Sequence, residues 1–304
     1  MIINKFPKYG DDILNLLDVC YTNPSDIQIT LEKPYFTFFK EKKNGNKRPI
    51  NVPNDKLKTL QKVTNILLRQ VSCPPYNFAG YEGQNAYKNA LAHKGNFAFL
   101  TTDLIDYYQS SKVEYVEDLL INVFKLNKDK EKEKIEFLLK ILTYNGYIPT
   151  GAPTSPILAF LAHKKLFDEI YEYTKNLDIV FTLYYDDITL SAKHGITMEV
   201  VKHIQKILAK HQLRLNPKKT TFYNYKKALI TGYYVYQSGK ISVPYHFGHD
   251  VIKMLEKKAI TDMSKTDLRK LIGKINHIQF VDKKAFYMVK KKAYKQFSKI
   301  VKKV

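Results

Sequence analysis

The stretch FTLYYDDITLSA, residues 181–192, sets two adjacent acids, Asp186 and Asp187, between two runs of aromatic, aliphatic and β-branched residues. Runs of this kind favour β-strands, and the polar pair between them indicates the turn of a hairpin. Asp is common in turns because its side chain can hydrogen-bond nearby backbone groups. The same two carboxylates could instead form half of a metal site, which would need a third acid from elsewhere in the chain.

Asp103 is the candidate for that third acid, because it ends the run NFAFLTTD, residues 96–103, which is typical of a buried strand. If this strand lies beside the hairpin in one sheet, three carboxylates converge and repel one another. Mg²⁺ relieves such repulsion and binds a few carboxylate oxygens together with phosphate and water. Two Mg²⁺ ions roughly 3.5 to 4 Å apart can activate a 3′-hydroxyl and stabilise a departing pyrophosphate. The pattern therefore points to polymerase chemistry.

The formal net charge of +21 and the pI near 9.6 are the strongest global signals in this 304-residue chain. A surface this basic attracts polyanions at long range. Residues 251–304 alone hold 16 Lys or Arg and four Asp or Glu. The 23 Tyr and 17 Phe offer surfaces on which bases can stack. Nucleic acid is therefore the favoured partner over a merely solvated surface or an anionic membrane.

Several features favour a globular protein of the cytoplasm. The apolar runs are shorter than the roughly 18 to 20 residues that a membrane span requires. The N-terminal MIINKFPKYGDD lacks the pattern of a secretory signal. Cys20 and Cys73 have neither CxxC spacing nor the density of a disulfide framework. We therefore expect no membrane partner and a cytoplasmic location.

Periodicity and turn signals predict an α+β fold, with an antiparallel sheet and helices on one face. Asn54 is the expected N-cap of one helix, and Gly146 is expected to close another. The predicted helices are 11–20, 54–71, 133–146, 157–176, 197–213 and a lysine-rich C-terminal tail. The predicted strands are a hairpin over 35–53, the strand ending at Asp103, the hairpin over 181–192, and β-rich pieces at 220–236 and 239–243.

Five ordered motifs between about residues 40 and 235 give the chain a specific family resemblance. Tyr184-Tyr185-Asp186-Asp187 resembles the YxDD signature of reverse transcriptases. The other four segments resemble, in order, the basic fingers segment, the first palm motif, the PxGxPxSPxL segment and the lysine-bearing motif of that family. They are NGNKRPINVP (44–53), TTDLIDYY (101–108), IPTGAPTSPILAFL (148–161) and LRLNPKKT (213–220).

The resemblance implies a right-hand polymerase with an N-terminal helix and fingers over residues 1–95, a palm with interleaved fingers elements over 96–240 and a basic helical thumb over 241–304. The reverse transcriptase domain as a whole is expected over about residues 30–240. Its implied metal ligands are Asp103, the backbone of Leu104, Asp186 and Asp187, with Lys219 as a further catalytic residue. The residues implied to contact dNTP, primer or template are Lys47, Arg48, Tyr108, Gly151, Ala152, Pro153, Tyr184 and Tyr185.

Three of these positions have simpler alternatives. Tyr108 could exclude ribonucleotides by its place against the sugar, or be an ordinary core Tyr. Arg48 could bind the triphosphate through its planar fork or lie on a hairpin surface. Lys219 could protonate pyrophosphate, but Lys218 competes for that role. Asp106 is interpreted as a structural or solvated acid.

Two further elements are similar to retron reverse transcriptases: NALAH, residues 89–93, and Ile230-Thr231-Gly232. LRKLIGKINHI, residues 268–278, also resembles the retron thumb. This likeness implies copying of a cognate structured non-coding RNA into a branched RNA-linked DNA, priming from a 2′-hydroxyl, a role in antiphage defence and a separately encoded effector. The implied RNA-binding residues are Asn89, His93, Thr231, Gly232, Arg269, Lys270 and Lys274. Asn89 and His93 could instead cap a turn.

The chain departs from the family pattern at three positions. Tyr185 stands where bacterial members usually have Ala, Thr150 where many polymerases of this type have Gln, and Ile230 where retron enzymes have Val. Rival interpretations are a group II intron-like or other defence-associated reverse transcriptase, and a non-catalytic RNA-binding scaffold. A scaffold would have no use for clustered negative charge facing RNA.

Overall fold

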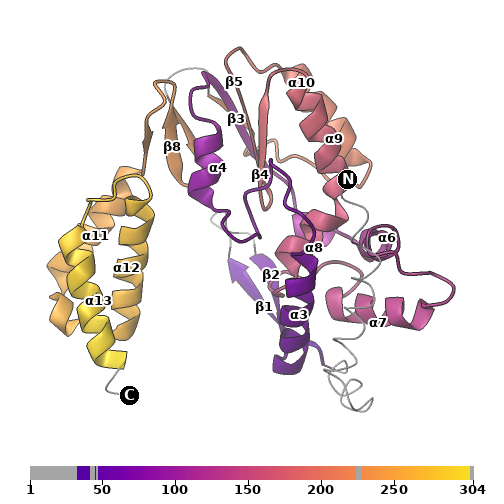
Figure 1. Cartoon of the computed structure of the whole chain (residues 1–304), viewed down its shortest axis with the longest axis horizontal. Coiled ribbons are helices and arrows are strands. Elements are labelled where there is room, and N and C mark those ends of the chain that lie inside the picture. The colour runs from indigo at the N-terminus through magenta and orange to yellow at the C-terminus, as the bar shows by residue number, and fades with distance from the viewer. Residues whose placement is uncertain (1–32, 42–44, 46, 224–226, 302–304) are drawn as a thin grey trace. The chain divides into compact units, whose positions relative to one another are not determined.

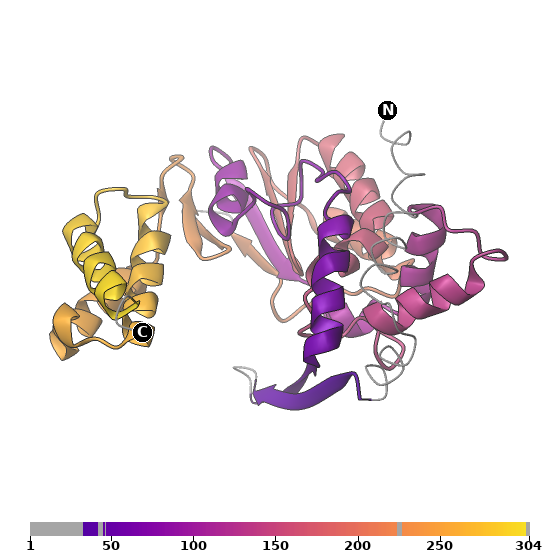
Figure 2. The same ribbon diagram turned by 60° about the horizontal axis from the view of Figure 1, so that its bottom comes forward.

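The computed structural model describes residues 33–41, 45, 47–223 and 227–301 (Figures 1 and 2). The helix predicted over residues 11–20 lies outside them. The chain divides into two compact units. The first comprises Met1–Gln84, Thr101–Leu190 and Ile196–Thr221, and the second comprises Asn85–Leu100, Ser191–Gly195 and Phe222–Val304. The division into residues 1–95, 96–240 and 241–304 stays a prediction.

The first unit contains the predicted N-terminal hairpin, formed by β1 (Tyr35–Glu41) and β2 (Lys47–Pro53). The two strands are antiparallel, and their register runs from the pair Tyr35 and Pro53 to the pair Glu41 and Lys47. Tyr35 anchors one face, because its hydroxyl accepts a 2.7 Å hydrogen bond from Gln61. Its ring also packs at 4.5 Å from that of Tyr144.

Helices make up most of the rest of the first unit. In α3 (Asp55–Leu68), Asn54 is the N-cap as predicted, and its Oδ1 accepts a 2.9 Å hydrogen bond from the Leu57 N–H. The others are α5 (Tyr107–Ser110), α6 (Val113–Asn122), α7 (Lys132–Leu142), α8 (Ser155–Ala162), α9 (Lys164–Lys175) and α10 (Met198–Ala209).

Two of the predicted helices were wrong in their bounds. Helix α7 ends at Leu142, and Gly146 instead supplies a positive φ of 81° in the turn that follows. The helix predicted over 157–176 is two helices that meet at His163. The His163 side chain is fully buried and bonds Ser111 Oγ at 2.9 Å and His211 Nδ1 at 3.0 Å. A buried imidazole needs such partners, and they come from distant parts of the chain.

A four-stranded sheet carries the hairpin over 181–192. Its order is β4 (Val180–Tyr184), β5 (Asp187–Ala192), β3 (Ala98–Asp103) and β6 (Thr221–Tyr223). The middle strands β5 and β3 are almost wholly buried. Helix α9 packs along β4, and α10 packs on α9 (Figure 1). The described strands form three separate sheets, whereas the sequence pattern suggested one.

The second unit contains a small antiparallel sheet with the order β7 (Lys227–Ile230), β8 (Tyr233–Tyr236) and β9 (Ile241–Ser242). Helix α4 (Ala86–Ala92) packs on β7 and β8. The core between them is built from Ala90, Phe99, Ala228, Ile230, Tyr233 and Val235.

The predicted helical tail is also present in the second unit, as α11 (Tyr245–Lys257), the short 3₁₀ helix η2 (Ile260–Asp262), α12 (Lys265–Gln279) and α13 (Tyr287–Val301). Ser264 and Asp267 form a reciprocal capping box at the start of α12. The apolar stripes of the helices meet in a core that includes Val251, Leu271 and Ala293. Within the described ranges, none of the helices combines the length and apolar character needed to cross a membrane.

Candidate active site

The turn between β4 and β5 consists of only Tyr185 and Asp186. Tyr185 has a φ of 58°, in the left-handed region that bulky residues rarely adopt. Such a conformation costs on the order of 1 to 3 kcal/mol, so the surrounding sheet must hold it in place. The Tyr185 ring packs edge-on to Tyr184, with 4.9 Å between centroids. This tight turn fixes Asp186 at its tip and Asp187 as the first residue of β5.

The structure brings Asp103 beside this turn. Strand β3 is the neighbour of β5, and the N–H of Leu104 donates a 2.9 Å hydrogen bond to the carbonyl of Asp186. The carbonyl of Asp103 accepts a 2.8 Å bond from Asn216. The Asp103 side chain is only 8% exposed. The end of one strand and the tip of the neighbouring hairpin therefore place the three predicted acids in one region.

Negative charge in this region is only partly compensated. Burial raises the pKa of Asp186, and Asp103 raises it further, while Lys219 and Arg48 lower it. The pKa of Asp187 is raised to about 7, first by desolvation and then by the charges of Asp186 and Asp103, although the residue is exposed at the turn. Burial is the larger cause of both shifts, and the neighbouring carboxylates add to it by disfavouring one another's ionised form.

Lys219 is the lysine that meets these acids. Its Nζ lies 2.5 Å from Asp103 Oδ2, and this hydrogen bond raises the pKa of Lys219, so the ammonium form is favoured. Lys218 and Lys219 are both exposed, and the ion pair with Asp103 is made by Lys219. This ion pair, rather than burial, is what distinguishes the two competing lysines.

A short turn around Asn216, which the sequence reasoning did not single out, holds Lys219 in place. The N–H groups of Lys219 and Thr220 both bond the carbonyl of Asn216, at 3.1 and 3.0 Å. The hydroxyls of Thr220 and Thr102 lie 2.8 Å apart, which ties the turn to β3. The Asn216-Pro217 dipeptide is a turn signal that could have revealed this role.

The donor set suits an open cation site. Within the described ranges, no three or more His, Cys, Asp or Glu side chains are grouped closely enough to enclose a metal. Asp103 Oδ1 is buried without a hydrogen-bond partner, while Oδ2 bonds Lys219. Mg²⁺ usually takes only one or two carboxylates and completes its shell with water and substrate phosphate. An orphaned buried oxygen beside two crowded carboxylates fits such an ion.

Tyr108 and Arg48 lie close enough to this region to act on its charges. Burial raises the pKa of Tyr108, Asp186 and Tyr185 raise it further, and Arg48 lowers it. Tyr108 is half-buried, whereas the neighbouring Tyr107 is 3% exposed and belongs to the core. Tyr108 is therefore less buried than Tyr107 and lies within electrostatic range of Asp186, and its contact with the sugar stays a prediction.

The Gly151 turn meets β2 at close range. Gly151 has a φ of 116°, and a Cβ there would lie 2.9 Å from the Asn51 carbonyl oxygen and 3.2 Å from Ile50 Cγ2. The N–H of Asn51 donates a 2.6 Å bond to the carbonyl of Thr150. The Thr150 hydroxyl accepts a 3.3 Å bond from Gln109. Only a residue without a side chain fits this junction.

The other residues of the first unit that are predicted to contact dNTP, primer or template differ in burial and orientation. Ala152 is buried and Pro153 is half-buried, directly before α8. Lys47 is exposed and opposite Glu41, and it neighbours Arg48 along β2, so its side chain points to the other face of the hairpin. The structure therefore brings Arg48 but not Lys47 toward the acids.

The NALAH residues are buried in the second unit. Asn89 is 1% exposed, and its Nδ2 donates a 3.3 Å bond to Thr231 Oγ1. Thr231 in turn bonds the carbonyl of Ala86 at 2.8 Å, in the turn that also holds Gly232. His93 is fully buried 2.6 Å from Ser191 Oγ, and burial lowers its pKa to about 3.

This burial bears on the two alternatives for Asn89 and His93. Asn89 joins α4 to the β7–β8 turn through Thr231, and His93 joins the end of α4 to Ser191 of β5. A direct side-chain contact to RNA would require both residues to leave their present partners. The structure therefore favours a supporting role, and a direct contact stays a prediction.

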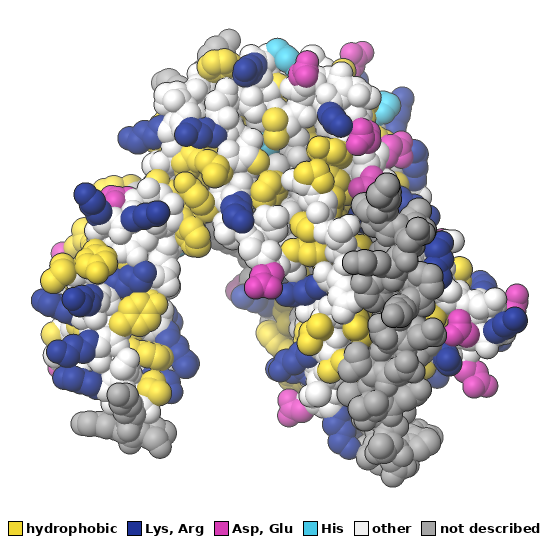
Figure 3. Space-filling view, viewed as in Figure 1, with side chains coloured by type: hydrophobic (Ala, Val, Ile, Leu, Met, Phe, Trp, Pro, Cys, Tyr) yellow, Lys and Arg dark blue, Asp and Glu magenta, His cyan; other side chains and the backbone are white. Residues whose placement is uncertain are grey.

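The predicted thumb residues lie on α12. Arg269 stands 5.5 Å from the centre of the Phe297 ring, and Lys274 pairs with Asp250 at 2.6 Å. Lys270 is exposed. Lys and Arg side chains alternate with apolar ones over the visible face of helices α11 to α13 (Figure 3). Such a mixture suits a nucleic-acid strand.

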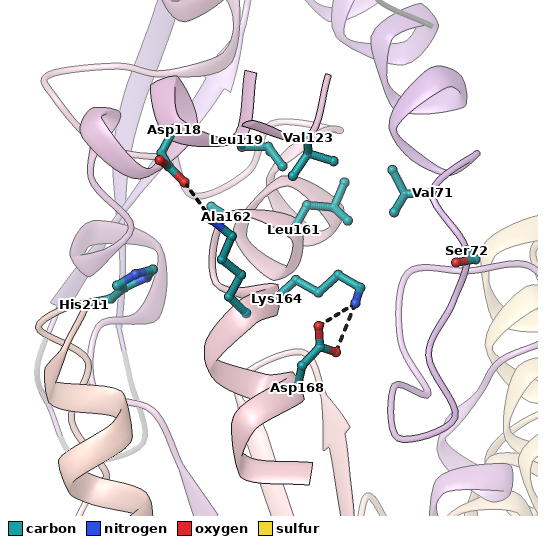
Figure 4. A pocket seen from close by; sticks show the side chains of 11 residues that line it. Val71, Ser72, Asp118, Leu119, Val123, Leu161, Ala162, Lys164, Asp168 and His211 are labelled. Carbon is teal, nitrogen blue, oxygen red and sulfur yellow. Dashed lines mark hydrogen bonds and ion pairs between the residues drawn. The ribbon is translucent and has the colours of Figure 1, made fainter. Parts of the chain in front are cut away.

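A separate pocket of about 220 Å³ lies elsewhere in the first unit (Figure 4). Leu119, Val123 and Leu161 are among its apolar lining residues. Two ion pairs lie along it, Lys164 with Asp168 at 2.7 Å and Lys165 with Asp118 at 3.7 Å. None of the predicted site residues lines it.

Comparisons with known proteins agree with this geometry. The family model described as "Reverse transcriptase (RNA-dependent DNA polymerase)" matches residues 40–235. The chain is 33% identical over 198 residues to the retron Ec86 reverse transcriptase of Escherichia coli, covering 63% of this chain and 59% of that one. It is 25% identical over 249 residues to the retron Mx162 reverse transcriptase of Myxococcus xanthus, covering 73% and 51%. The predicted resemblance to bacterial retron-type reverse transcriptases is thus confirmed, although the chain spans little more than half the length of these relatives.

A solved structure shows the same fold. Apo telomerase from Candida tropicalis, truncated from its C-terminal domain, superposes with a TM-score of 0.52 at 12% identity, covering 79% of this chain and 60% of that one. The match supports the α+β polymerase fold that the sequence predicted.

Proposed function

Because the chain belongs to the reverse transcriptase (RNA-dependent DNA polymerase) family, we propose that it synthesises DNA on an RNA template. The observation that carries this proposal is the meeting of Asp103, at the end of β3, with Asp186 and Asp187 at the β4–β5 turn. Family membership implies a divalent cation, and the oxygen donors favour Mg²⁺, with two ions per site.

Different residues of the chain would bind the cations, orient the triphosphate and donate a proton. Asp103, the backbone of Leu104, Asp186 and Asp187 would hold the cations. When bound, Mg²⁺ makes a hydroxyl more acidic and neutralises phosphate charge. Arg48 would orient the triphosphate through paired hydrogen bonds. The protonated Lys219 would supply a proton to the departing pyrophosphate.

We further propose that the template is a cognate structured non-coding RNA, primed from a 2′-hydroxyl, and that the branched product takes part in antiphage defence with a separately encoded effector. The similarity to retron reverse transcriptases supports this proposal. The two retron-like elements also meet in the structure, through the hydrogen bond from Asn89 to Thr231.

Purification of the protein from cells that carry its RNA gene tests the proposal. A branched RNA–DNA species should copurify with the wild-type protein and be absent from the Asp186→Asn/Asp187→Asn variant. Linear RNA alone in both samples would contradict a retron-type reaction. Incorporation of dNTPs without a branch would favour another prokaryotic reverse transcriptase, and no incorporation at all would favour an RNA-binding scaffold.

A further inference from the structure

Another pocket of the first unit, of about 410 Å³, lies between α5 and the segment that follows α10. We call it the α5–α10 pocket. Its lining includes Gln109 and Ser110 of α5, Lys112 just beyond them, and Gln212 and Arg214 after α10. Its volume is within the range of small-molecule sites, roughly 300 to 1,000 Å³. None of the residues predicted to bind metal, dNTP, primer, template or RNA lines it.

The charges of the α5–α10 pocket are not balanced. In the other pocket, of about 220 Å³, each of the two lining lysines pairs with a lining carboxylate. Among the described residues that line the α5–α10 pocket there are two cations, Lys112 and Arg214, and no acid. Both residues are exposed. Two cations that share a pocket without an acid attract an anion.

The start of α6 adds to this attraction. The helix begins at Val113, and its N-cap residue, Lys112, makes no side-chain capping bond. The N-terminus of a helix carries a partial positive charge, which favours a nearby anion. Glu114 is in the first turn of α6 but does not line the pocket. A bound anion would therefore offset both the helix terminus and the lysine placed there.

Carbonyls at the end of α10 are bonded by the chain itself, which limits their repulsion of an anion. The N–H of Gln212 bonds the carbonyl of Ala209 at 3.0 Å, and the N–H of Leu213 bonds that of Leu208 at 3.1 Å. Gln212 has a φ of 58°, the left-handed conformation that closes a helix in this way.

Polyphosphate is the class of anion that the lining groups fit. The planar fork of Arg214 can donate two parallel hydrogen bonds to a phosphate, and Lys112 adds a point charge. The side-chain amides of Gln109 and Gln212 supply further donors. Sites for single-stranded nucleic acid add aromatic rings on which bases stack, and none of the described lining residues is aromatic. A free polyphosphate is therefore favoured over an RNA strand.

One wall of the pocket is bonded to the candidate active site. The carbonyl of Arg214 accepts a 2.9 Å hydrogen bond from the N–H of Ile105. Two residues further on, the N–H of Asn216 donates a 2.8 Å bond to the carbonyl of Asp103, and the Asn216 turn holds Lys219. An anion that fixes Arg214 would therefore also steady the segment that carries Lys219.

We propose that the α5–α10 pocket is an accessory site for a free polyphosphate anion, either inorganic pyrophosphate or the phosphates of a nucleoside triphosphate. The site is distinct from the three carboxylates. This inference goes beyond the DNA synthesis proposed above and does not depend on it, because binding needs no turnover.

Isothermal titration calorimetry of the whole chain with inorganic pyrophosphate, ATP and dTTP in EDTA tests this inference. EDTA removes the cations through which the carboxylates would hold phosphate, so the candidate active site should contribute little. Lys112→Gln/Arg214→Gln should raise the Kd for pyrophosphate about tenfold or more, because charge-assisted hydrogen bonds are lost. Similar Kd values for the three probes would identify the phosphates as the ligand, and a lower Kd for ATP or dTTP would identify a nucleotide.

Lys202→Gln/Lys206→Gln is the matched control, because it removes the same charge from exposed positions on α10. It should keep the wild-type Kd, and an equal loss in this control would show that net charge alone attracts the anion. Arg214→Lys keeps the charge without the fork, so its Kd should lie between those of the wild-type protein and the double variant. If it matched the wild type, the fork would have no role.

Three results would overturn the inference. The first is a wild-type protein that binds none of the three probes. The second is a loss of pyrophosphate binding in Arg48→Gln alone, which would place the anion at the candidate active site. The third is an unchanged pyrophosphate Kd in Lys112→Gln/Arg214→Gln together with weaker binding of a single-stranded RNA oligonucleotide, which would assign the pocket to an RNA strand.

Discussion

At the scale of single residues, the site combines charge repulsion with backbone strain. Tyr185 is the residue of the YxDD stretch that departs from the family, and it also has the left-handed conformation at the tip of the turn. Asp187 follows it with a pKa raised to about 7. Both features place an energetic cost at the hairpin that a bound cation can offset for the acids.

Asp187 should make stability depend on pH when divalent cations are removed. Its pKa is about 7 in the folded protein and 3.8 for the unperturbed group, so the folded protein retains a proton that the unfolded chain loses between these values. The free energy of unfolding should therefore fall from pH 4 to pH 7, by about 1 kcal/mol after discounting for solvent screening. Urea unfolding in EDTA measures this fall.

The control for that experiment is the exposed Asp118. Asp187→Asn should flatten the fall, and Asp118→Asn should leave it unchanged. If the free energy of unfolding fell equally in the wild-type protein and in Asp187→Asn, ionisation of Asp187 would not be the source of the pH dependence. Replacing EDTA with Mg²⁺ should raise the free energy of unfolding of the wild-type protein at pH 8.

Tyr108 should govern the choice between deoxyribonucleotides and ribonucleotides. Tyr108→Ala removes the ring beside Asp186 and should raise the ratio of kcat/KM for ribonucleotides to that for dNTPs by about tenfold or more. Single-nucleotide incorporation measures both values. Tyr107→Phe serves as the control, since Tyr107 is buried in the core. Unchanged selectivity in Tyr108→Ala would contradict the assignment.

Substitutions of Lys219 and Lys218 should have clearly different effects on kcat. Lys219→Ala should lower kcat by about 10²-fold, the usual worth of a positioned general acid, and Lys218→Ala should have little effect. A pH profile of kcat distinguishes loss of the acid from loss of structure, because only Lys219→Ala should remove the limb at high pH. An equal loss of kcat in the two variants would contradict a specific role for Lys219.

Among the helices and strands, the sequence predicted those whose formation depends on interactions between residues close together in the chain. The β1–β2 hairpin, the Asn54 cap of α3, the strand ending at Asp103 and the β4–β5 hairpin all follow from alternation, capping and turn chemistry. The break at His163 does not follow from them, and the His163 side chain there bonds Ser111 and His211, which are far away in the chain.

The junction of the Gly151 turn with β2 should tolerate no side chain. Gly151→Ala places a Cβ 2.9 Å from the Asn51 carbonyl at a φ of 116°, so it should destabilise the protein by roughly 1 to 3 kcal/mol. Gly195→Ala is the matched control, since nothing lies within 4 Å of its Cβ position. Thermal unfolding compares the two. Equal Tm values for both variants would show that the close approach is not present in solution.

At the scale of the whole molecule, the net charge and the ordered motifs indicated the class of partner and the family, because neither depends on tertiary contacts. The division into two units could not be predicted in the same way. The second unit is assembled from three segments far apart in the chain, and only contacts between distant residues define it. For the same reason the sequence alone did not show that Asn89 and His93 are buried.

Primer extension on an RNA template tests whether Asp103, Asp186 and Asp187 form a catalytic centre. The wild-type protein should extend the primer with dNTPs when Mg²⁺ is present, and EDTA should stop the reaction. Asp186→Asn/Asp187→Asn should bind the same primer–template with a similar Kd and give no detectable extension. Extension by this variant at the wild-type rate would contradict the assignment of the three carboxylates as the catalytic centre.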